Sequence, residues 1–416
     1  MTEIRHIRRI AMLSVHTCPA ATPGGFKTGG MNVYVRALSQ ELARRNIQVD
    51  IFTRWQDSCQ FHENPLFDQA HNVRLIHIPA GPGESVEPDR LVPFLDDFTR
   101  GVESFATENS VFYDVIYAHY WLSGLVGLVL RAAWNSAPPI PLVQMFHTLG
   151  IMKDRVDGKL QVVSSPRNLA EAELMAHVDR VIAATPAEYE QLIRLYDAPR
   201  DKVRIVPPGV DTERFHPGDQ RAAKVSIGFS PDDHLLLFVG RPEPLKAIDT
   251  IFAALWQLFD AEPILRKSVT LLLIGGQPNE SMVQSLRTQV GVMGIDDNVR
   301  FLAAQTQDTL PQYYVAADGL LMPSDYESFG MVALEALASG TPVVASQVGG
   351  LGYLVRDGES GYHVPTRDPA ALADAIKRLL TQPEIRMQMA LNAVKSAQQY
   401  DWGHIADRLL AIFEAC

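Results

Sequence analysis

The sequence predicts an α/β protein with two doubly wound, Rossmann-like domains, each built on a parallel sheet. Three observations predict this fold. Short apolar runs alternate with amphipathic segments along most of the chain, which is the pattern of βαβ units. A polar, turn-rich segment at residues 207–230 interrupts the alternation once, after which the pattern restarts. The length of 416 residues is sufficient for two hydrophobic cores.

The first domain is predicted at residues 1–208, on seven apolar runs with the length and composition of buried strands. These runs are 10–15, 49–53, 73–78, 114–119, 142–147, 180–184 and 203–207. Helical patterns occur between them at 33–45, at 91–107 and from residue 122. The regular alternation indicates crossover connections and therefore a parallel sheet.

The second domain is predicted at residues 209–398, where the pattern restarts after the turn-rich segment. Strands are expected at 235–239, 269–274, 299–302, 319–322 and 343–345. Helices are expected at 247–259, 280–291, 310–317, 331–339, 369–380, 383–399 and 402–414. Ligands of doubly wound domains bind beyond the carboxyl ends of the strands, so the loops there are expected to carry the site.

Composition excludes several classes of function. A formal net charge of −11 and a pI near 5.6 argue against non-specific binding of nucleic acid. The basic N-terminus is followed by an apolar run too short for a signal peptide, and no apolar stretch approaches the 20 residues of a membrane span. Cys18, Cys59 and Cys416 are odd in number, widely spaced and without a metal-ligand pattern, which indicates reduced thiols and a cytoplasmic protein.

A segment at residues 319–345 reads as strand, loop, helix and strand, and it contains two glutamates at chemically useful positions. The helix that begins near Met331 directs unpaired N–H groups beyond the sheet, as a site for a diphosphate requires. Glu327 precedes this helix and Glu335 lies about two turns beyond it. The two carboxylates could accept sugar and ribose hydroxyls of a sugar nucleotide. They could equally be solvated surface charges.

Two further loops follow predicted strands. Gly29 and Gly30 stand between the first strand and the first helix, where glycines allow a ligand close to the backbone, although they also serve ordinary turns. Arg241 and Lys246 follow the first strand of the second half and could neutralise the charge on a departing diphosphate. There is no Gly-x-Gly-x-x-Gly and no P-loop motif, which disfavours a nicotinamide enzyme or an NTPase.

The sequence around the glutamates, Glu-Ser-Phe-Gly-Met-Val-Ala-Leu-Glu at 327–335 with Ala-Ser-Gly-Thr-Pro-Val-Val-Ala after it, resembles the paired-glutamate signature of retaining GT-B glycosyltransferases of family four. Gly-Gly-Met-Asn-Val-Tyr and the Gly-Arg…Lys string are similar to the family's glycine loop and diphosphate clamp, so the resemblance covers nearly the whole chain. It implies a GT-B fold with a cleft between the domains. It also implies that the C-terminal helix, 399–416, returns to the N-terminal domain.

The resemblance implies a donor site for a nucleotide sugar and assigns roles to its residues. The catalytic residues would be His147, Arg241, Lys246 and Glu327. The donor-binding residues would be Gly29, Gly30, Arg241, Lys246, Glu327, Phe329, Gly330, Met331, Val332 and Glu335. Glu327 would contact the sugar and Glu335 the ribose. The leaving diphosphate would take the proton of the acceptor, without an enzyme nucleophile.

For the acceptor, the resemblance and the presence of phosphate-binding side chains indicate Met31, Asn32, Tyr120, Thr148, Lys153 and Arg167. Arg90 is a further candidate cation, whereas His119 reads as a packing residue. In relatives with phosphorylated acceptors, a lysine precedes a Leu-x-Pro helix. Pro88 stands at that position here, which disfavours an inositol phosphate acceptor.

The predicted function is the transfer of a hexose from UDP-glucose to a phosphorylated small molecule, with fructose 6-phosphate the favoured acceptor and sucrose 6-phosphate the product. The alternative is an inositol-phosphate glycosyltransferase that uses UDP-N-acetylglucosamine, to which the glutamate stretch and Val348-Gly349-Gly350-Leu351 are closer. A phosphorylase, an epimerase or a nucleotide-sugar sensor would be a third class. No cofactor is expected, and no metal, because the only acidic triplet near the site is Asp325-Tyr326-Glu327. The base of the donor and the oligomeric state stay open.

Overall fold

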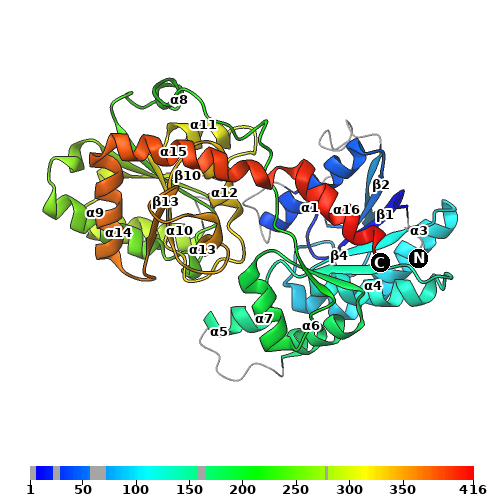
Figure 1. Cartoon of the computed structure of the whole chain (residues 1–416). Coiled ribbons are helices and arrows are strands. Elements are labelled where there is room, and N and C mark those ends of the chain that lie inside the picture. The colour runs from blue at the N-terminus through cyan, green and yellow to red at the C-terminus, as the bar shows by residue number, and fades with distance from the viewer. Residues whose placement is uncertain (1–5, 22–28, 57–71, 157–164, 277–279) are drawn as a thin grey trace. The chain divides into compact units, whose positions relative to one another are not determined.

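The computed structural model describes residues 6–21, 29–56, 72–156, 165–276 and 280–416. The chain divides into two compact units, shown in Figure 1. The first contains the described residues up to Pro208 together with Trp402–Cys416, and the second contains Gly209–Asp401. Each is an α/β unit with a parallel sheet, as predicted from the alternating pattern.

The first unit is built on a seven-stranded parallel sheet with the order β3-β2-β1-β4-β5-β6-β7. All seven predicted strands are present. They are β1 (Arg9–Ser14), β2 (Gln48–Arg54), β3 (Val73–Ile78), β4 (Val115–His119), β5 (Leu142–Met145), β6 (Arg180–Ala183) and β7 (Val203–Ile205). Their continuous apolar runs are explained by burial on both faces of the sheet.

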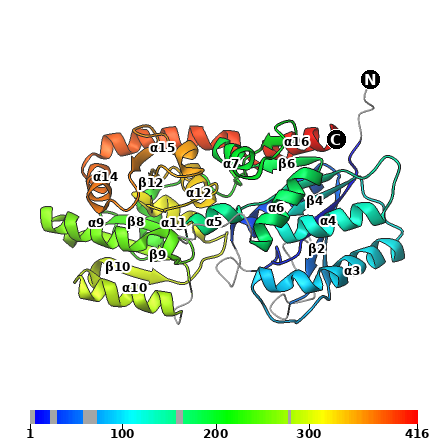
Figure 2. The same ribbon diagram turned by 90° about the horizontal axis from the view of Figure 1, so that it is seen from below.

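Helices of the first unit connect these strands, and Figure 2 shows α3 and α4 side by side. The helices are α1 (Gly30–Arg44), the 3-10 helix η1 (Pro88–Phe94), α3 (Leu95–Glu108), α4 (Trp121–Ala133), α5 (Gly150–Val156), α6 (Pro166–His177), α7 (Pro186–Tyr196) and α16 (Trp402–Glu414). The single helix predicted at 91–107 is in fact two. Pro93 lies inside η1, where it has no N–H to donate, and α-helical bonding begins only with α3.

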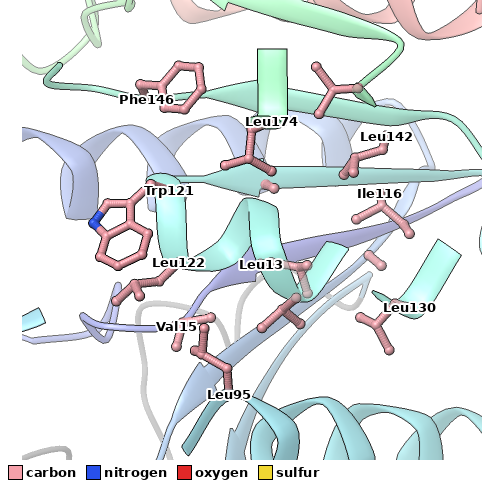
Figure 3. Close-up of a cluster of buried hydrophobic side chains, with 14 of the residues drawn as sticks. Leu13, Val15, Leu95, Ile116, Trp121, Leu122, Leu130, Leu142, Phe146 and Leu174 are labelled. Carbon is pink, nitrogen blue, oxygen red and sulfur yellow. The ribbon is translucent and has the colours of Figure 1, made fainter. Parts of the chain in front are cut away.

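The core of the first unit lies between the sheet and its helices. Figure 3 shows how the side chains of α4, among them Trp121, Leu122 and Leu130, pack on those of the strands. Leu13 from β1 and Leu142 from β5 belong to the same cluster and are fully buried. Side chains of this size each stabilise the fold by about 1.5–3 kcal/mol when buried. The core therefore fixes the ends of the strands that carry the polar residues described below.

The last helix of the chain packs on the first one. Figure 1 shows α16, in red, beside α1, in blue. Arg45, which ends α1, donates from Nε to Asp407 at 2.8 Å and from Nη2 to the carbonyl of Gly403 at 2.8 Å. The ring of Trp402 lies 5.4 Å from that of Tyr34. The C-terminal residues thus complete the unit that the N-terminal residues begin.

The second unit has a six-stranded parallel sheet with the order β10-β9-β8-β11-β12-β13. Its strands are β8 (His234–Val239), β9 (Val269–Ile274), β10 (Val299–Leu302), β11 (Gly319–Met322), β12 (Val343–Ser346) and β13 (Gly361–Val364). Five were predicted, and β13 was missed because it is short and begins with a glycine. Gly361 allows the close approach of β12, since a Cβ there would lie 1.9 Å from the carbonyl oxygen of Val343.

The helices of the second unit include one in the segment predicted as a turn-rich linker. Asp219 caps that helix, α8, by accepting from the N–H of Ala222 at 3.1 Å, a signal that the prediction overlooked. The helices are α8 (Gln220–Ser226), η2 (Pro244–Lys246), α9 (Ile248–Ala261), η3 (Leu265–Lys267), α10 (Ser281–Val292), η4 (Asp296–Asn298), α11 (Leu310–Ala316), α12 (Met331–Ala338), α13 (Leu351–Leu354), α14 (Pro369–Thr381), α15 (Pro383–Ala397) and η5 (Gln398–Tyr400).

Each sheet has a topological switch point, where the chain turns from one side of the sheet to the other. In the first unit this point lies between β1 and β4, and in the second between β8 and β11. Crevices at such points are the usual ligand sites of doubly wound sheets. The predicted site loops follow these strands.

Two expectations concern the chemistry of the chain as a whole. Cys18 is disulfide-bonded and Cys416 is an exposed thiol, so the prediction of reduced thiols is wrong for Cys18. The count and spacing of cysteines carry no information on which sulfur atoms approach in space; Cys59 lies outside the described residues. Among the helices described, none combines the length and the apolar character needed to cross a bilayer.

Candidate functional site

The loop between β11 and α12 contains the first predicted glutamate and ends in a glycine with a positive φ. Gly330 immediately precedes α12 and has φ +99°, a conformation that an L side chain would strain. The helix therefore begins abruptly, with its free N–H groups at the carboxyl end of the sheet. Met331 and Val332 are half-buried in the first turn, and Phe329 is buried.

Glu327 and Lys246 form an ion pair. The Nζ atom of Lys246, at the end of η2, lies 2.6 Å from Oε2 of Glu327. Burial opposes the charge on the ammonium, but the adjacent carboxylate outweighs it and raises the pKa of Lys246 above its ordinary value. Lys246 was predicted to contact the diphosphate of a donor and Glu327 its sugar, and the ion pair links these two side chains directly. A bound diphosphate would share Lys246 with Glu327.

Backbone contacts hold the two loops that carry this pair. The N–H of Asp325 donates to the carbonyl of Leu245 at 2.9 Å, and the N–H of Gly350 donates to that of Glu327 at 3.1 Å. A Cβ on Gly349 would lie 1.7 Å from the carbonyl oxygen of Glu327. Gly349 and Gly350 thus support the loop that carries Glu327, a role that was not predicted for them.

Glu335 is oriented by two neighbours that sequence reasoning missed. Its Oε2 accepts from the hydroxyl of Tyr314 at 2.8 Å, and its Oε1 accepts from Nε2 of Gln307 at 3.2 Å. Glu335 is only 6% exposed, and burial followed by its charge raises the pKa of Tyr314 far above the ordinary value. Tyr314 and Gln307 belong to no recognisable motif. The predicted contact with a ribose stays a prediction.

Arg241 follows β8 in a crowded turn. A Cβ on Gly275 would lie 2.0 Å from the carbonyl oxygen of Gly240, so the chain after β9 runs directly against the chain after β8. Nη1 of Arg241 lies 3.3 Å from a carboxylate oxygen of Glu243. Its Nε is buried and has no hydrogen-bond partner in the part of the chain that the structure describes. An anion could satisfy this donor.

In the first unit, three of the predicted acceptor residues lie together. The guanidinium of Arg167 lies over the ring of Tyr120, with Cζ 4.7 Å from its centroid. Nη2 of Arg167 donates to the carbonyl oxygen of Thr148 at 2.6 Å and to its hydroxyl at 3.2 Å. Tyr120 follows β4 and Thr148 follows β5, so the sheet itself brings them together. Nη1 of Arg167 has no partner among the described residues.

A buried carboxylate supports Arg167. Glu171, one turn along α6, accepts from Nε of Arg167 at 2.8 Å and from the N–H of Gly150 at 2.9 Å. It also accepts a hydrogen bond from the hydroxyl of Tyr196. Glu171 is fully buried, so this arrangement fixes the guanidinium in one position. Neither Glu171 nor Tyr196 was predicted.

The glycine loop begins α1. Gly29 and Gly30 are exposed and Met31 is half-buried. Asn32, in contrast, is 2% exposed, and its amide nitrogen donates to the hydroxyl of Thr17 at 2.9 Å and to the carbonyl of Cys18 at 2.6 Å. Asn32 therefore holds the chain after β1 against the start of α1.

His147 is paired with His119. Nδ1 of His119 and Nε2 of His147 are 3.0 Å apart, and one of the two donates to the other. Burial lowers the pKa of His147 to about 3 and that of His119 well below its ordinary value, so both rings are neutral at physiological pH. Tyr34 packs edge-on against both rings. His119, predicted as a packing residue, also contacts His147 directly.

Two predicted acceptor cations lie apart from this cluster. Lys153 on α5 and Arg90 on η1 are exposed, and no side-chain contact ties either to Arg167. Pro88 begins η1, where its missing N–H costs nothing. The backbone before it is held by Arg54, which donates to the carbonyls of Pro82 and Glu84.

Within the described ranges, no three His, Cys, Asp or Glu side chains gather as ligands for a metal ion. The charged groups at the carboxyl ends of the second sheet include the cations Arg241 and Lys246, and an anion could bind between these two cations. The residues after the strands of the first sheet are mostly hydroxyl, imidazole and guanidinium donors, which suit a polyol or a phosphate.

Two family models match the chain, one over its N-terminal half and one over its C-terminal half. "Glycosyltransferase Family 4" matches residues 28–214, and "Glycosyl transferases group 1" matches residues 219–396. A D-inositol 3-phosphate glycosyltransferase of Saccharomonospora viridis is 43% identical, over 98% of this chain and 94% of the relative. The chain belongs to the family-four glycosyltransferases. A second such enzyme, from Actinosynnema mirum, is 41% identical over 98% of this chain and 97% of its own.

Solved structures superpose on nearly the whole chain. Sucrose-phosphate synthase from Thermosynechococcus elongatus superposes with a TM-score of 0.84 at 32% identity, covering 98% of both chains. The Anabaena protein HepE in complex with UDP-glucose has a TM-score of 0.76 at 21% identity, covering 99% of this chain and 100% of its own. The GT-B fold predicted from the sequence is thereby confirmed.

Proposed function

We propose that this glycosyltransferase moves a sugar from a nucleotide sugar to an inositol phosphate. The observation that carries the proposal is the cluster of Tyr120, Thr148 and Arg167. Nη1 of Arg167 has no partner among the described residues, while Glu171 holds Nε and Thr148 holds Nη2. The guanidinium is thus fixed in position, and its Nη1 can donate to a phosphate oxygen in a charge-assisted hydrogen bond. The similarity to D-inositol 3-phosphate glycosyltransferases over nearly the whole chain supports the same acceptor class.

The donor in this proposal is UDP-N-acetylglucosamine, and its site is in the second unit. Arg241, Lys246 and the start of α12 would stabilise the diphosphate as it leaves, while Glu327 and Glu335 would accept hydroxyl hydrogens. The neutral His147 would act as a hydrogen-bond partner of the sugar rather than as a charged acid. The acceptor hydroxyl would attack from the face that the diphosphate leaves, so the product would retain the configuration of the donor.

The experiment is a screen of UDP release. Purified enzyme is assayed with UDP-N-acetylglucosamine or UDP-glucose against D-inositol 3-phosphate, myo-inositol and fructose 6-phosphate. The proposal predicts the highest kcat/KM for the N-acetyl donor with inositol phosphate, and NMR of the product then gives the anomeric configuration. Equal rates with myo-inositol would contradict a phosphate-directed acceptor site. An Arg167→Lys variant should lose most of the discrimination, because one ammonium nitrogen cannot keep the contacts to Glu171 and Thr148 and also donate to the phosphate.

Fructose 6-phosphate is the second candidate acceptor, with UDP-glucose as donor. Pro88 favours it, because the lysine expected before the following helix in inositol-phosphate enzymes is missing. The overall similarity to sucrose-phosphate synthase is compatible with it. Sucrose 6-phosphate as the main product of the screen would establish this candidate instead.

We also infer that the reaction needs no divalent metal, since cations and helix N–H groups are available for the diphosphate. Activity should be unchanged after treatment with EDTA. Loss of activity that magnesium or manganese restores would contradict this.

A further inference from the structure

Arg367 contacts three separate segments of the second unit. It lies in the loop between β13 and α14, far in sequence from Lys246 and Glu327. Nε and Nη2 donate to the carboxylate of Asp325 at 2.8 and 2.5 Å, and Nη1 donates to both oxygens of Asp249 at 2.9 and 3.0 Å. Nη2 also donates to the carbonyl oxygen of Pro244 at 3.0 Å. Every nitrogen of the guanidinium is engaged.

The three segments are those that place the Lys246–Glu327 ion pair. Pro244 begins η2, which ends at Lys246, and Asp249 lies in the first turn of α9 directly after it. Asp325 lies two residues before Glu327 in the loop after β11. The backbone of this loop is already joined to η2 by the bond from the N–H of Asp325 to the carbonyl of Leu245. Arg367 adds the side-chain contacts across the same junction.

The charges in this cluster make the arginine necessary. Asp249 and Asp325 both accept from the guanidinium of Arg367, so its positive charge offsets two carboxylates at once. Lysine could replace the charge but not the geometry, since its single nitrogen cannot form two bidentate contacts. The side chains are partly exposed, at 45% for Arg367 and 24% for Asp325, so salt will weaken the contact.

We propose that Arg367 is a positioning residue for catalysis: it clamps the η2 loop to the β11–α12 loop and so sets the geometry of the Lys246–Glu327 pair. The effect of this clamp on the reaction rate rests on the proposed function, in which Lys246 and Glu327 contact the donor. It also gives Asp325 a role. The first residue of the Asp325-Tyr326-Glu327 triplet accepts hydrogen bonds from Arg367.

The structural effect of the clamp is measured without any substrate. Hydrogen exchange in wild type and Arg367→Ala should differ in both loops, 244–249 and 324–328, with at least tenfold faster exchange in the variant. Arg221→Ala is the matched control, because Arg221 forms an exposed ion pair with Asp232 at 2.9 Å in the same unit. Unchanged exchange in either loop of the Arg367 variant overturns the proposal, whatever reaction the enzyme catalyses.

The catalytic effect is measured by a double-mutant cycle. Arg367→Ala should lower kcat at least tenfold, and Arg367→Lys should recover only part of the loss. In a Lys246→Ala background the same change should have little further effect, because the clamp acts through Lys246. If Arg367→Ala lowers kcat by the same factor with and without Lys246, Arg367 contributes only to the stability of the fold, and the positioning role is overturned. If no donor and acceptor react, the proposed function fails, whereas the exchange result still decides on the clamp.

Discussion

Lys246 and Glu327 illustrate at the residue scale how a charge can be balanced before a ligand arrives. The ammonium is half-buried and paired with a carboxylate, so its charge is held in place without being left unsatisfied. Diphosphate binding would add a second anion to the same ammonium. As the glycosidic bond breaks, the anion gains charge, and a preorganised cation then contributes more than it did in the ground state.

Lys246→Ala is therefore expected to lower kcat by about 10²–10³ and to raise the donor KM much less. Glu327→Gln should also lower kcat. The loss of activation free energy in the double variant should be smaller than the sum of the losses in the two single variants. Steady-state kinetics of folded variants checks this. Lys377→Ala is the control, because Lys377 forms an exposed ion pair with Glu262 at 2.5 Å in the same unit. A folded Lys246 variant with wild-type kcat would remove this lysine from the mechanism.

Glu335 provides the second prediction at this scale, through the tyrosine that orients it. Loss of the carboxylate in Glu335→Ala should weaken UDP binding by about 1.5–3 kcal/mol. Tyr314→Phe should weaken it by about 1 kcal/mol, since the carboxylate stays but loses its buried partner. Tyr313→Phe, the neighbouring position on α11, should leave the affinity unchanged. Titration calorimetry with UDP measures all three, and an unchanged affinity in Glu335→Ala would contradict the ribose assignment.

Helix α16 shows at the element scale how a remote segment supports the predicted site. Trp402 packs on Tyr34, and Phe413 packs on Tyr117 at 5.2 Å. The hydroxyls of the two tyrosines are 2.8 Å apart, and Tyr34 also contacts His147. The aromatic rings thus form a continuous set of contacts from the C-terminal helix to the histidine pair.

Trp402→Ala should destabilise the first unit by about 3–5 kcal/mol, because a nearly buried ring is lost from a packed site. Denaturant unfolding measures the loss. Trp256→Ala, which removes a ring that is 49% exposed on α9, should change the stability by less than about 1 kcal/mol. Similar losses in the two variants would show that α16 adds no specific packing.

At the scale of the whole molecule, stability should depend on pH through a buried glutamate of α7. Burial raises the pKa of Glu188 from 4.5 to about 7, although the N–H of Ala184 donates to its carboxylate and opposes the shift. Between pH 4.5 and about 7, Glu188 keeps its proton in the folded protein but releases it in the unfolded chain. The contribution of this proton to the free energy of unfolding is therefore complete below pH 4.5 and is lost as the pH rises toward 7. The charge of Glu171 also raises the pKa of Glu188, and the charge of Glu188 contributes to the raised pKa of Tyr117.

Glu188→Gln should remove this component, which amounts to at most about 3 kcal/mol. The variant should gain stability over wild type as the pH is raised from 5 to 8. Denaturant unfolding across this range tests the prediction. Glu190→Gln on the same helix is the control, because Glu190 pairs with Arg194 at the surface. Parallel pH profiles for wild type and Glu188→Gln would contradict the prediction.

The strands of the first unit were predicted well from the sequence, because short continuous apolar runs are typical of strands that are buried on both faces of a parallel sheet. It predicted β13 and α8 poorly, since these depend on a close backbone approach at Gly361 and on one capping aspartate. Among site residues, Tyr120, Thr148 and Arg167 could be found because they follow strands or belong to a motif. Tyr314, Glu171 and Arg367 could not, because a supporting side chain is defined by its neighbours in space rather than by spacing along the chain.

The return of α16 to the first unit has a consequence for the order of events during synthesis. Among the residues that the structure describes, the second unit is the single segment Gly209–Asp401, and its ends are joined where the N–H of Val210 donates to the carbonyl of Tyr400 at 2.8 Å. All of these residues have been synthesised once Asp401 has been added to the chain. The unit that is translated first lacks Trp402 and Phe413 until the last residues emerge. The unit whose synthesis begins first is therefore completed last, and a premature stop within residues 402–416 is expected to destabilise the first unit and leave the second intact.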